Sequence, residues 1–123
     1  MPKGTILVVD DSFATITVVE RILKNEGYKV ITSFDGVDGL KKAYIDFPDL
    51  VILDLVLPAL DGFEVCRSLK QSEKCKGIPI IIVTARKELI EGERERIGAD
   101  DYIIKPFKEK ELLKKVEKVL DKK

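Results

Sequence analysis

The stretch ILVVDDS, residues 6–12, joins an apolar run to two adjacent acids and a serine. The apolar run is rich in β-branched residues and predicts a buried strand. Ser12 is a favourable residue at the start of a helix. Asp10 and Asp11 stand between strand and helix, where like charges beside a core are costly unless a cation compensates them. The stretch therefore predicts a strand, a helix and a charged site at their junction.

Apolar runs and segments of helical spacing alternate along the rest of the chain. Strands are predicted at 5–10, 28–33, 49–54, 79–84 and 101–105. Helices are predicted from Ser12 to Asn25 and over 36–47, 62–74, 87–97 and 108–121. The runs at 49–54 and 79–84 are continuously apolar, which is typical of parallel strands covered on both faces.

Five successive strand–helix units predict an α/β fold in which helices cover both faces of a parallel sheet. Right-handed crossovers make such a fold doubly wound. With 123 residues, the chain is predicted to form a single domain over 1–123. Ligands of such sheets bind beyond the carboxyl ends of the strands. Those ends are predicted to carry Asp10, Asp54, Thr84 and Lys105.

Composition excludes several classes of function. Lys+Arg and Asp+Glu both number 22, so no net basic field favours nucleic acid or an anionic membrane. No apolar run approaches the roughly 20 residues that cross a bilayer, and the start MPKGTILVV lacks a signal-peptide core. The chain has no histidine, which excludes Ser-His-Asp and Cys-His catalysis. Its two cysteines, Cys66 and Cys75, are predicted to be free thiols in the cytoplasm.

The acids predict a metal site if the first and third strands are neighbours. Asp10, Asp11 and Asp54 then share one pocket, where three carboxylates cannot all stay ionised without a cation or a raised pKa. Mg²⁺ fits this pocket, because it prefers carboxylate, water and phosphate oxygens. The plainer alternative is that Asp10 and Asp11 only favour the amino end of the first helix.

Lys105 and Thr84 would add phosphate contacts to this pocket. The ammonium of a lysine is suited to holding a phosphate oxygen, and the bond before Pro106 can be cis, which would aim Lys105 into the site. The Thr84 hydroxyl can donate to a phosphoryl oxygen. Each residue alone has a plainer explanation. Lys105 could simply be an exposed lysine at the end of a strand, and Thr84 could be present because threonine favours strands.

Four segments occur in the order strand–DD–S, strand–D–LPALDG, strand–TA and GADDYIIKPF. Together they cover nearly the whole chain and resemble the receiver domain of bacterial two-component response regulators, including single-domain chemotaxis-type regulators. The resemblance implies a flavodoxin-like (βα)5 three-layer sandwich with a parallel five-stranded sheet in the order 2-1-3-4-5.

The resemblance also implies roles for the acids. Asp54 would be the phosphoacceptor, and Asp11 and Asp54 would ligate Mg²⁺ directly with the main-chain carbonyl of Val56. Asp10 would act mainly through a water molecule on the metal. Val56 and Arg86 occupy positions that tune phosphate lifetime, and neither offers a carboxylate or amide to orient water, so slow self-hydrolysis is expected.

The remaining implied roles concern phosphate binding and output. Thr84 and Lys105 would bind phosphoryl oxygens, and Tyr102 would be the aromatic switch. The phosphodonor would be a phosphohistidine of a sensor histidine kinase or histidine phosphotransfer protein, and the fourth helix, fifth strand and fifth helix would bind a downstream effector protein. Such a domain catalyses its own aspartyl phosphorylation and dephosphorylation but acts as a signalling switch. We expect no direct contact with nucleic acid and no membrane insertion.

Four other functions fit the sequence less well. An FMN-binding module would be repelled by DDS after the first strand, and an aspartyl phosphatase would carry a second acid where this chain has Val56. A DNA-binding regulator would need an output domain, and we expect none within 1–123. The remaining alternative is a degenerate receiver that binds partners without phosphorylation, although such a domain would have lost an acid or the lysine.

The first predicted helix carries two apolar stripes. The stripe assigned to the core consists of Ile16, Val19 and Leu23. A second stripe with i, i+4, i+8 spacing consists of Ala14, Val18 and Ile22. This second stripe predicts a helix-on-helix contact with the phosphodonor.

Overall fold

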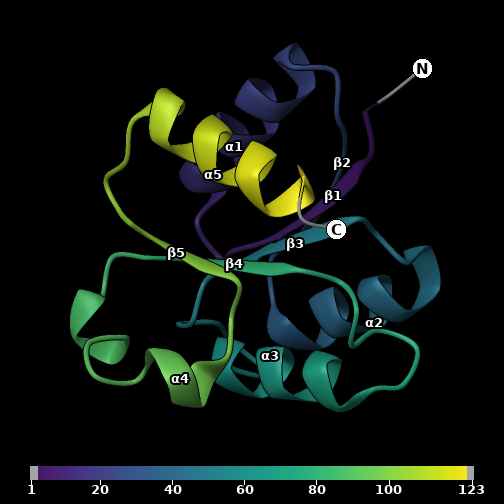
Figure 1. Cartoon of the computed structure of the whole chain (residues 1–123), viewed down its shortest axis with the longest axis vertical. Coiled ribbons are helices and arrows are strands. Elements are labelled where there is room, and N and C mark those ends of the chain that lie inside the picture. The colour runs from purple at the N-terminus through teal and green to yellow at the C-terminus, as the bar shows by residue number, and fades with distance from the viewer. Residues whose placement is uncertain (1–2, 122–123) are drawn as a thin grey trace.

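The computed structural model describes residues 3–121 as five alternating strand–helix units (Figure 1). The strands are β1 (Thr5–Val9), β2 (Lys29–Ser33), β3 (Leu50–Leu53), β4 (Ile80–Thr84) and β5 (Asp101–Ile104). The helices are α1 (Phe13–Asn25), α2 (Gly36–Asp46), α3 (Gly62–Gln71), α4 (Arg94–Ile97) and α5 (Glu109–Asp121), with a 3-10 turn η1 (Lys87–Leu89) before α4.

All strand pairs in the sheet are parallel, and the strand order is β2-β1-β3-β4-β5. The predicted doubly wound fold is therefore confirmed. Val9 pairs with both Ser33 and Leu53, and the amide of Asp54 donates to the carbonyl of Val9 at 3.0 Å. This register makes β1 and β3 end at the same level, so Asp10 and Asp54 leave the sheet side by side.

The sheet separates two apolar layers. Figure 1 shows α1 and α5 on one face and α2, α3 and α4 on the other. Side chains of β1 alternate between these faces: Ile6 and Val8 belong to the layer under α1 and α5, whereas Leu7 and Val9 belong to the opposite layer. Because both faces are covered, nearly every residue of the central strands is buried.

Two glycines let the loop after β3 lie close to the neighbouring helices. A Cβ atom at Gly62 would lie 2.1 Å from the carbonyl oxygen of Asp54, and one at Gly36 would lie 1.6 Å from that of Leu60. Any larger residue would force backbone apart at these points. Because glycine has no side chain, the starts of α2 and α3 can pack directly against the backbone of the loop that begins at Asp54.

The fourth predicted helix is wrong as a continuous element. The structure divides 87–97 into η1, a turn and the four-residue α4. Gly92 adopts a left-handed conformation with φ of 74° between them, and this conformation interrupts the helical path. The third helix also ends three residues early, at Gln71. All other predicted boundaries agree with the structure to within one residue.

The structure tests the predictions made for the cysteines and for membrane-spanning helices. Cys66 and Cys75 are buried free thiols, as predicted. Among residues 3–121, no helix combines the length and apolar character that a membrane crossing requires.

Candidate functional site

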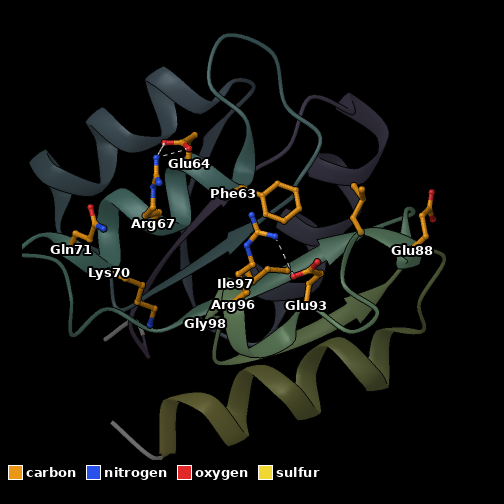
Figure 2. Close-up of a pocket in the computed structure, with 11 residues that line it drawn as sticks. Phe63, Glu64, Arg67, Lys70, Gln71, Glu88, Glu93, Arg96, Ile97 and Gly98 are labelled. Atoms are coloured by element: carbon orange, nitrogen blue, oxygen red, sulfur yellow. Dashed lines mark hydrogen bonds and ion pairs between the residues drawn. The ribbon is translucent and has the colours of Figure 1, made fainter.

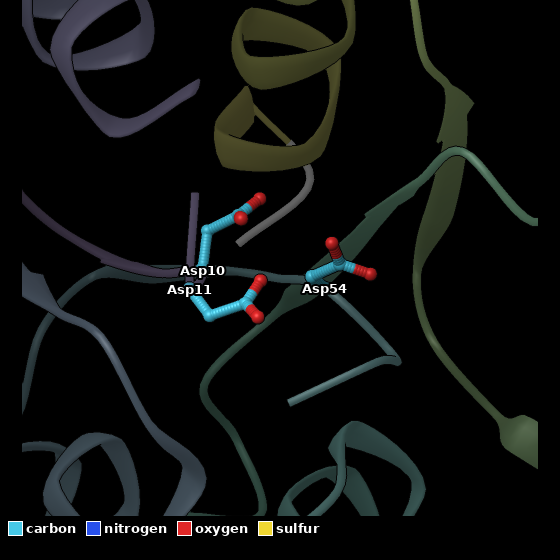
Figure 3. A group of neighbouring side chains, drawn as sticks. All are labelled: Asp10, Asp11 and Asp54. Carbon is cyan, nitrogen blue, oxygen red and sulfur yellow. The ribbon is translucent and has the colours of Figure 1, made fainter. Parts of the chain in front are cut away.

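Three acids meet at the carboxyl end of β1 and β3. Asp10, Asp11 and Asp54 each offer a carboxylate oxygen, and these oxygens all lie within 4.8 Å of one another. Figure 3 shows the carboxylate of Asp11 pointing toward Asp54. Asp10 and Asp54 are buried, with 2% and 6% of their surfaces exposed, while Asp11 is open to solvent. The predicted acidic pocket therefore exists, with one side accessible from outside.

Lys105 is the cationic partner of two of these acids. Its Nζ donates to Oδ2 of Asp10 at 2.7 Å and to Oδ2 of Asp54 at 3.0 Å. Only 16% of the Lys105 side chain is exposed, and the Lys105–Pro106 bond is cis. One ammonium beside three carboxylates leaves two negative charges to be balanced when all are ionised.

Burial and hydrogen bonding shift the pKa values of Asp10 and Lys105. Burial raises the pKa of Asp10, and this effect outweighs the hydrogen bonds from Lys105 and the Ser12 amide. Burial is the largest single effect and would lower the pKa of Lys105, but the hydrogen bonds to Asp10 and Asp54 and the charges of these acids together raise that pKa. Lys105 is therefore cationic throughout the neutral pH range.

Main-chain amides fix the orientation of both buried carboxylates. The amide of Ser12 donates to Oδ1 of Asp10 at 2.9 Å, and the amide of Val56 donates to Oδ1 of Asp54 at 3.1 Å. Each acid thus binds a backbone donor through one oxygen and Lys105 through the other. The backbone of Val56 is held next to Asp54, while its side chain is exposed.

Thr84 lies at the end of β4 and is fully buried. Its Oγ1 accepts a hydrogen bond from the amide of Arg86 at 3.2 Å. The amide of Lys105 donates to the Thr84 carbonyl at 2.9 Å, so Thr84 and Lys105 leave adjacent strands together. The structure thereby brings the carboxyl ends of β4 and β5 to the pocket formed after β1 and β3.

Tyr102 points inward from the edge strand β5 and is 5% exposed. Its hydroxyl donates to the carbonyl of Arg94 at 2.9 Å and accepts from the amide of Ala99 at 3.3 Å. The guanidinium of Arg94 lies over the ring, 4.6 Å from its centre. Arg94 could not be identified from the sequence, because a contact from the start of α4 to a later strand follows neither helical nor strand periodicity.

The second apolar stripe of α1 is shorter than predicted. Val18 is 40% exposed and Ala14 is exposed, but Ile22 is only 4% exposed and belongs to the core. The pattern alone did not reveal this, because α1 packs against both the sheet and α5. A stacked pair of exposed rings, Phe13 and Phe34, lies beside the start of this helix with centroids 6.3 Å apart.

A doubly wound sheet whose carboxyl edge carries three acids and a lysine defines a receiver-type α/β domain. The family model described as response regulator receiver domain matches residues 6–117, and the chain belongs to this family. It is thus the receiver domain of a two-component response regulator, which is a signalling switch.

Curated relatives agree with this assignment. The chain is 43% identical over 116 residues to the alkaline phosphatase synthesis transcriptional regulatory protein PhoP of Bacillus subtilis, covering 94% of this chain and 48% of that protein. It is 42% identical over 116 residues to the response regulator ArlR of Staphylococcus aureus, covering 94% and 52%. The chain therefore spans about half the length of these relatives.

Solved structures share the whole fold. A putative response regulator from Chloroflexus aurantiacus has a TM-score of 0.90 and 33% identity, covering 98% of this chain and 99% of that one. Chemotaxis response regulator CheY4 of Vibrio cholerae has a TM-score of 0.86 and 32% identity, covering 94% and 98%. The receiver domain of sensor histidine kinase PA1611 from Pseudomonas aeruginosa has a TM-score of 0.87 and 33% identity, covering 96% and 98%, and has a magnesium ion coordinated in its active site cleft.

Proposed function

We propose that this receiver accepts a phosphoryl group on Asp54 from a phosphohistidine of a sensor histidine kinase or histidine phosphotransfer protein. The observation that carries the proposal is the position of Lys105, whose ammonium binds Asp54 and Asp10 together at one edge of the acidic pocket. A carboxylate is a suitable nucleophile for phosphorus, and a fixed cation beside it lowers the cost of bringing an anionic phosphoryl group close.

The transfer is a displacement at phosphorus. One carboxylate oxygen of Asp54 forms the new O–P bond as the P–N bond to the donor imidazole breaks. The electron pair of that bond stays on the imidazole nitrogen, which then takes a proton from solvent. The Lys105 ammonium donates a hydrogen bond to Asp54. As the phosphoryl group arrives, the ammonium donates to the phosphoryl oxygens in place of the carboxylate. The Thr84 hydroxyl donates a hydrogen bond to another of these oxygens.

The donor set of the pocket fits Mg²⁺. Carboxylate oxygens of three acids within 4.8 Å are hard ligands, and two negative charges remain there after Lys105 is counted. Asp11 and Asp54 would hold the ion directly with the carbonyl of Val56, and Asp10 would act mainly through water. When bound, Mg²⁺ supplies neutralisation of the charge on the phosphoryl oxygens.

The output passes from Asp54 through Thr84 and Tyr102 to the surface formed by α4, β5 and α5, where a downstream effector protein binds. A phosphoryl group adds charge and acceptor oxygens that attract the Thr84 hydroxyl. Tyr102 then shifts between its inward and outward positions as a two-state element. Tyr102 occupies the inward position in this structure.

The alternative of a phosphorylation-independent receiver is not favoured, because all three acids are present in one cluster and Lys105 contacts two of them. The absence of nucleic acid binding is proposed for these 123 residues alone. A relative of about twice the length is named a transcriptional regulatory protein.

Intact-protein mass measurement tests the proposed phosphorylation. Incubation with acetyl phosphate and Mg²⁺ should add the mass of one phosphoryl group to the parent chain, and a chelator should prevent the addition. Asp54→Ala should abolish it. Asp46→Ala is the matched control, since Asp46 is exposed at the end of α2 and should leave labelling unchanged. Equal labelling of Asp54→Ala and the parent would disprove the assignment of Asp54.

A further inference from the structure

A polar network joins the carboxyl end of β2 to the first turns of α2. The Ser33 hydroxyl donates to Oδ2 of Asp38 at 2.5 Å, and Lys42 forms an ion pair with the same carboxylate at 3.0 Å. Nζ of Lys42 also donates to the carbonyl of Thr32 at 2.7 Å. Two consecutive residues of β2 are therefore bound to α2, one through its hydroxyl and the other through its carbonyl.

The bond between Ser33 and Asp38 joins a buried hydroxyl to an ionised carboxylate. Ser33 is 1% exposed, so its hydroxyl needs a partner within the protein. The hydrogen bonds from Ser33 and Lys42 hold the pKa of Asp38 below its ordinary value, and Asp38 is therefore ionised at neutral pH. A hydrogen bond to an ionised acceptor is roughly twice as strong as one between neutral groups.

The main chain of Ser33 connects this network to the acidic pocket. The Asp10 amide donates to the Ser33 carbonyl at 3.0 Å, one residue beyond the last β1–β2 pair, which is formed by Val9 and Ser33. The Asp10 side chain accepts from the Ser12 amide and from Lys105. Ser33 therefore holds the main chain of Asp10, while groups of the pocket hold its side chain.

The start of α2 also lies directly against the end of β1. A Cβ atom at Gly39 would lie 2.7 Å from Cγ1 of Val9, so no side chain fits between helix and strand at this point. β2 is an edge strand, and within residues 3–121 it pairs only with β1. The network with α2 thus supports β2 on the side where the described sheet offers no further strand.

We propose that Ser33, bound to Asp38, is a positioning residue that holds the main chain of Asp10 and thereby keeps the acidic pocket in the shape that binds Mg²⁺. The metal-binding part of this inference rests on the proposed function. Groups that orient metal ligands from outside typically change metal affinity by roughly 10- to 100-fold, and because Asp10 would act mainly through water we expect a smaller effect of about three- to tenfold. If the network only fastened α2 to the sheet, its loss would lower stability and leave Mg²⁺ affinity unchanged.

Ser33→Ala tests the position of Asp10 without any metal. Loss of the hydroxyl frees the end of β2 from Asp38, so the Asp10 amide should exchange its hydrogen with solvent about fivefold faster, as expected for the net contribution of one hydrogen bond. The Asp54 amide, which donates to the Val9 carbonyl, is the internal reference and should change less. Exchange at Asp10 as slow as in the parent would overturn the proposal.

Titration calorimetry with Mg²⁺ measures the effect on the pocket. Ser33→Ala and Asp38→Ala should each bind Mg²⁺ about three- to tenfold more weakly than the parent. Asp38→Asn keeps a side-chain oxygen that can accept from the Ser33 hydroxyl, and it should regain most of the affinity that Asp38→Ala loses. Parent-like affinity in both alanine variants would contradict the positioning role. Equal losses in Asp38→Asn and Asp38→Ala would also contradict it, because they would assign the effect to charge.

Asp100→Ala is the matched control for lost stability. The Asp100 carboxylate accepts from the Ile80 amide at 2.8 Å and from Lys70 at 3.0 Å, at the amino end of β4 and away from the acids. The groove beside Lys70 (Figure 2) is lined by α3 and by 88–98 and is separate from the acidic pocket. Asp100→Ala should lower the free energy of unfolding in urea and leave Mg²⁺ affinity unchanged. A loss of affinity as large as that of Ser33→Ala would rule out a specific role for Ser33.

The positioning role and the proposed function can fail separately. If the parent and Ser33→Ala bind Mg²⁺ equally well and Asp54 accepts phosphate in both, the positioning role is wrong and the proposed function stands. If the parent neither binds Mg²⁺ nor accepts phosphate, the proposed function fails together with the metal-binding part of this inference. Amide exchange at Asp10 then still decides whether Ser33 holds this residue.

Discussion

Lys105 donates a hydrogen bond to Asp54 at 3.0 Å although 51 residues separate them in the chain. The same ammonium reaches Asp10 at 2.7 Å, across 95 residues. It therefore links the ends of β1, β3 and β5, although β5 pairs with neither of the other two strands. A single cation thus joins the edge strand to the acidic pocket.

Replacing Lys105 by alanine should destabilise the chain and uncouple the site. At pH 7 the buried carboxylates of Asp10 and Asp54 would lose their cation, and we expect the free energy of unfolding in urea to fall by about 1–3 kcal/mol. Beryllofluoride, which mimics a phosphoryl group on Asp54, should still bind when Mg²⁺ is present. The NMR chemical-shift changes that it causes should be much smaller, because the mimic loses the cation that holds it.

Lys110→Ala provides the control for this loss of charge, since Lys110 is exposed on α5. It should change the stability by less than about 0.5 kcal/mol. Equal beryllofluoride-induced shifts in Lys105→Ala and the parent would contradict the role of Lys105 in the response.

Removing Asp11 should weaken Mg²⁺ binding sharply. Asp11 is the exposed member of the acidic cluster, so Asp11→Ala should remove a ligand with little effect on packing. Asp10→Ala should weaken binding less. Titration calorimetry measures both, with Asp46→Ala as the control for loss of an acid elsewhere. Unchanged Mg²⁺ affinity in Asp11→Ala would mean that the ion binds elsewhere or not at all.

Much of the fold was predictable because its signals are local. Continuous apolar runs located the strands, and the ends of those runs located Asp10, Asp54 and Thr84. Parallel strands in a doubly wound sheet then place these ends at one edge. The strand order came from the resemblance to receivers, since periodicity does not specify which strands are neighbours.

The errors arose where tertiary packing or a small free-energy difference decides the outcome. Helical spacing over 87–97 predicted one helix. A glycine costs only about 1 kcal/mol inside a helix, so the presence of Gly92 did not predict a break. Ile22 was assigned to the second stripe of α1, but it belongs to the core that α1 shares with the sheet and α5. The contacts of Lys105 with Asp10 and Asp54 join distant parts of the chain and leave no periodic signal.

The exposed face of α1 should contact the phosphodonor. Val18 is 40% exposed beside Ala14, and an apolar contact with a helix of the donor would bury it. Val18→Glu should slow phosphotransfer from a cognate donor, by about tenfold if one buried side chain's transfer free energy is lost. Val37→Glu is the matched control on α2, where Val37 is 54% exposed. Unimpaired transfer to Val18→Glu would rule out this docking face.

Asp38 should make stability depend on pH in the acidic range. Hydrogen bonds from Ser33 and Lys42 hold the pKa of Asp38 below its ordinary value of 3.8. A carboxylate with a lowered folded pKa stabilises the fold above its unfolded pKa, and this contribution disappears as pH falls through the folded pKa.

The comparison of Asp38→Asn with the parent isolates this effect. In urea unfolding, the parent should be the more stable chain at pH 6, and the difference should shrink below about pH 3.8. Asp46→Asn, at an exposed position, should show a smaller change with pH. A difference that is constant from pH 6 to pH 3 would mean that Asp38 gains no stability from its ionised form.

Thr84→Ala should separate phosphorylation from response. The nucleophile Asp54 and the cation Lys105 remain in place, so acetyl phosphate should still label the chain. The hydroxyl that holds the Arg86 amide is lost, and with it the group that can follow a phosphoryl oxygen. Beryllofluoride-induced NMR shift changes over 88–104 should therefore fall to less than about half of those in the parent, since one of two phosphoryl contacts is removed. Thr84→Ser is the matched variant, because it keeps the hydroxyl and should retain most of the response. If Thr84→Ala and Thr84→Ser respond alike, the signal reaches the α4 and β5 surface by a route that does not use this hydroxyl.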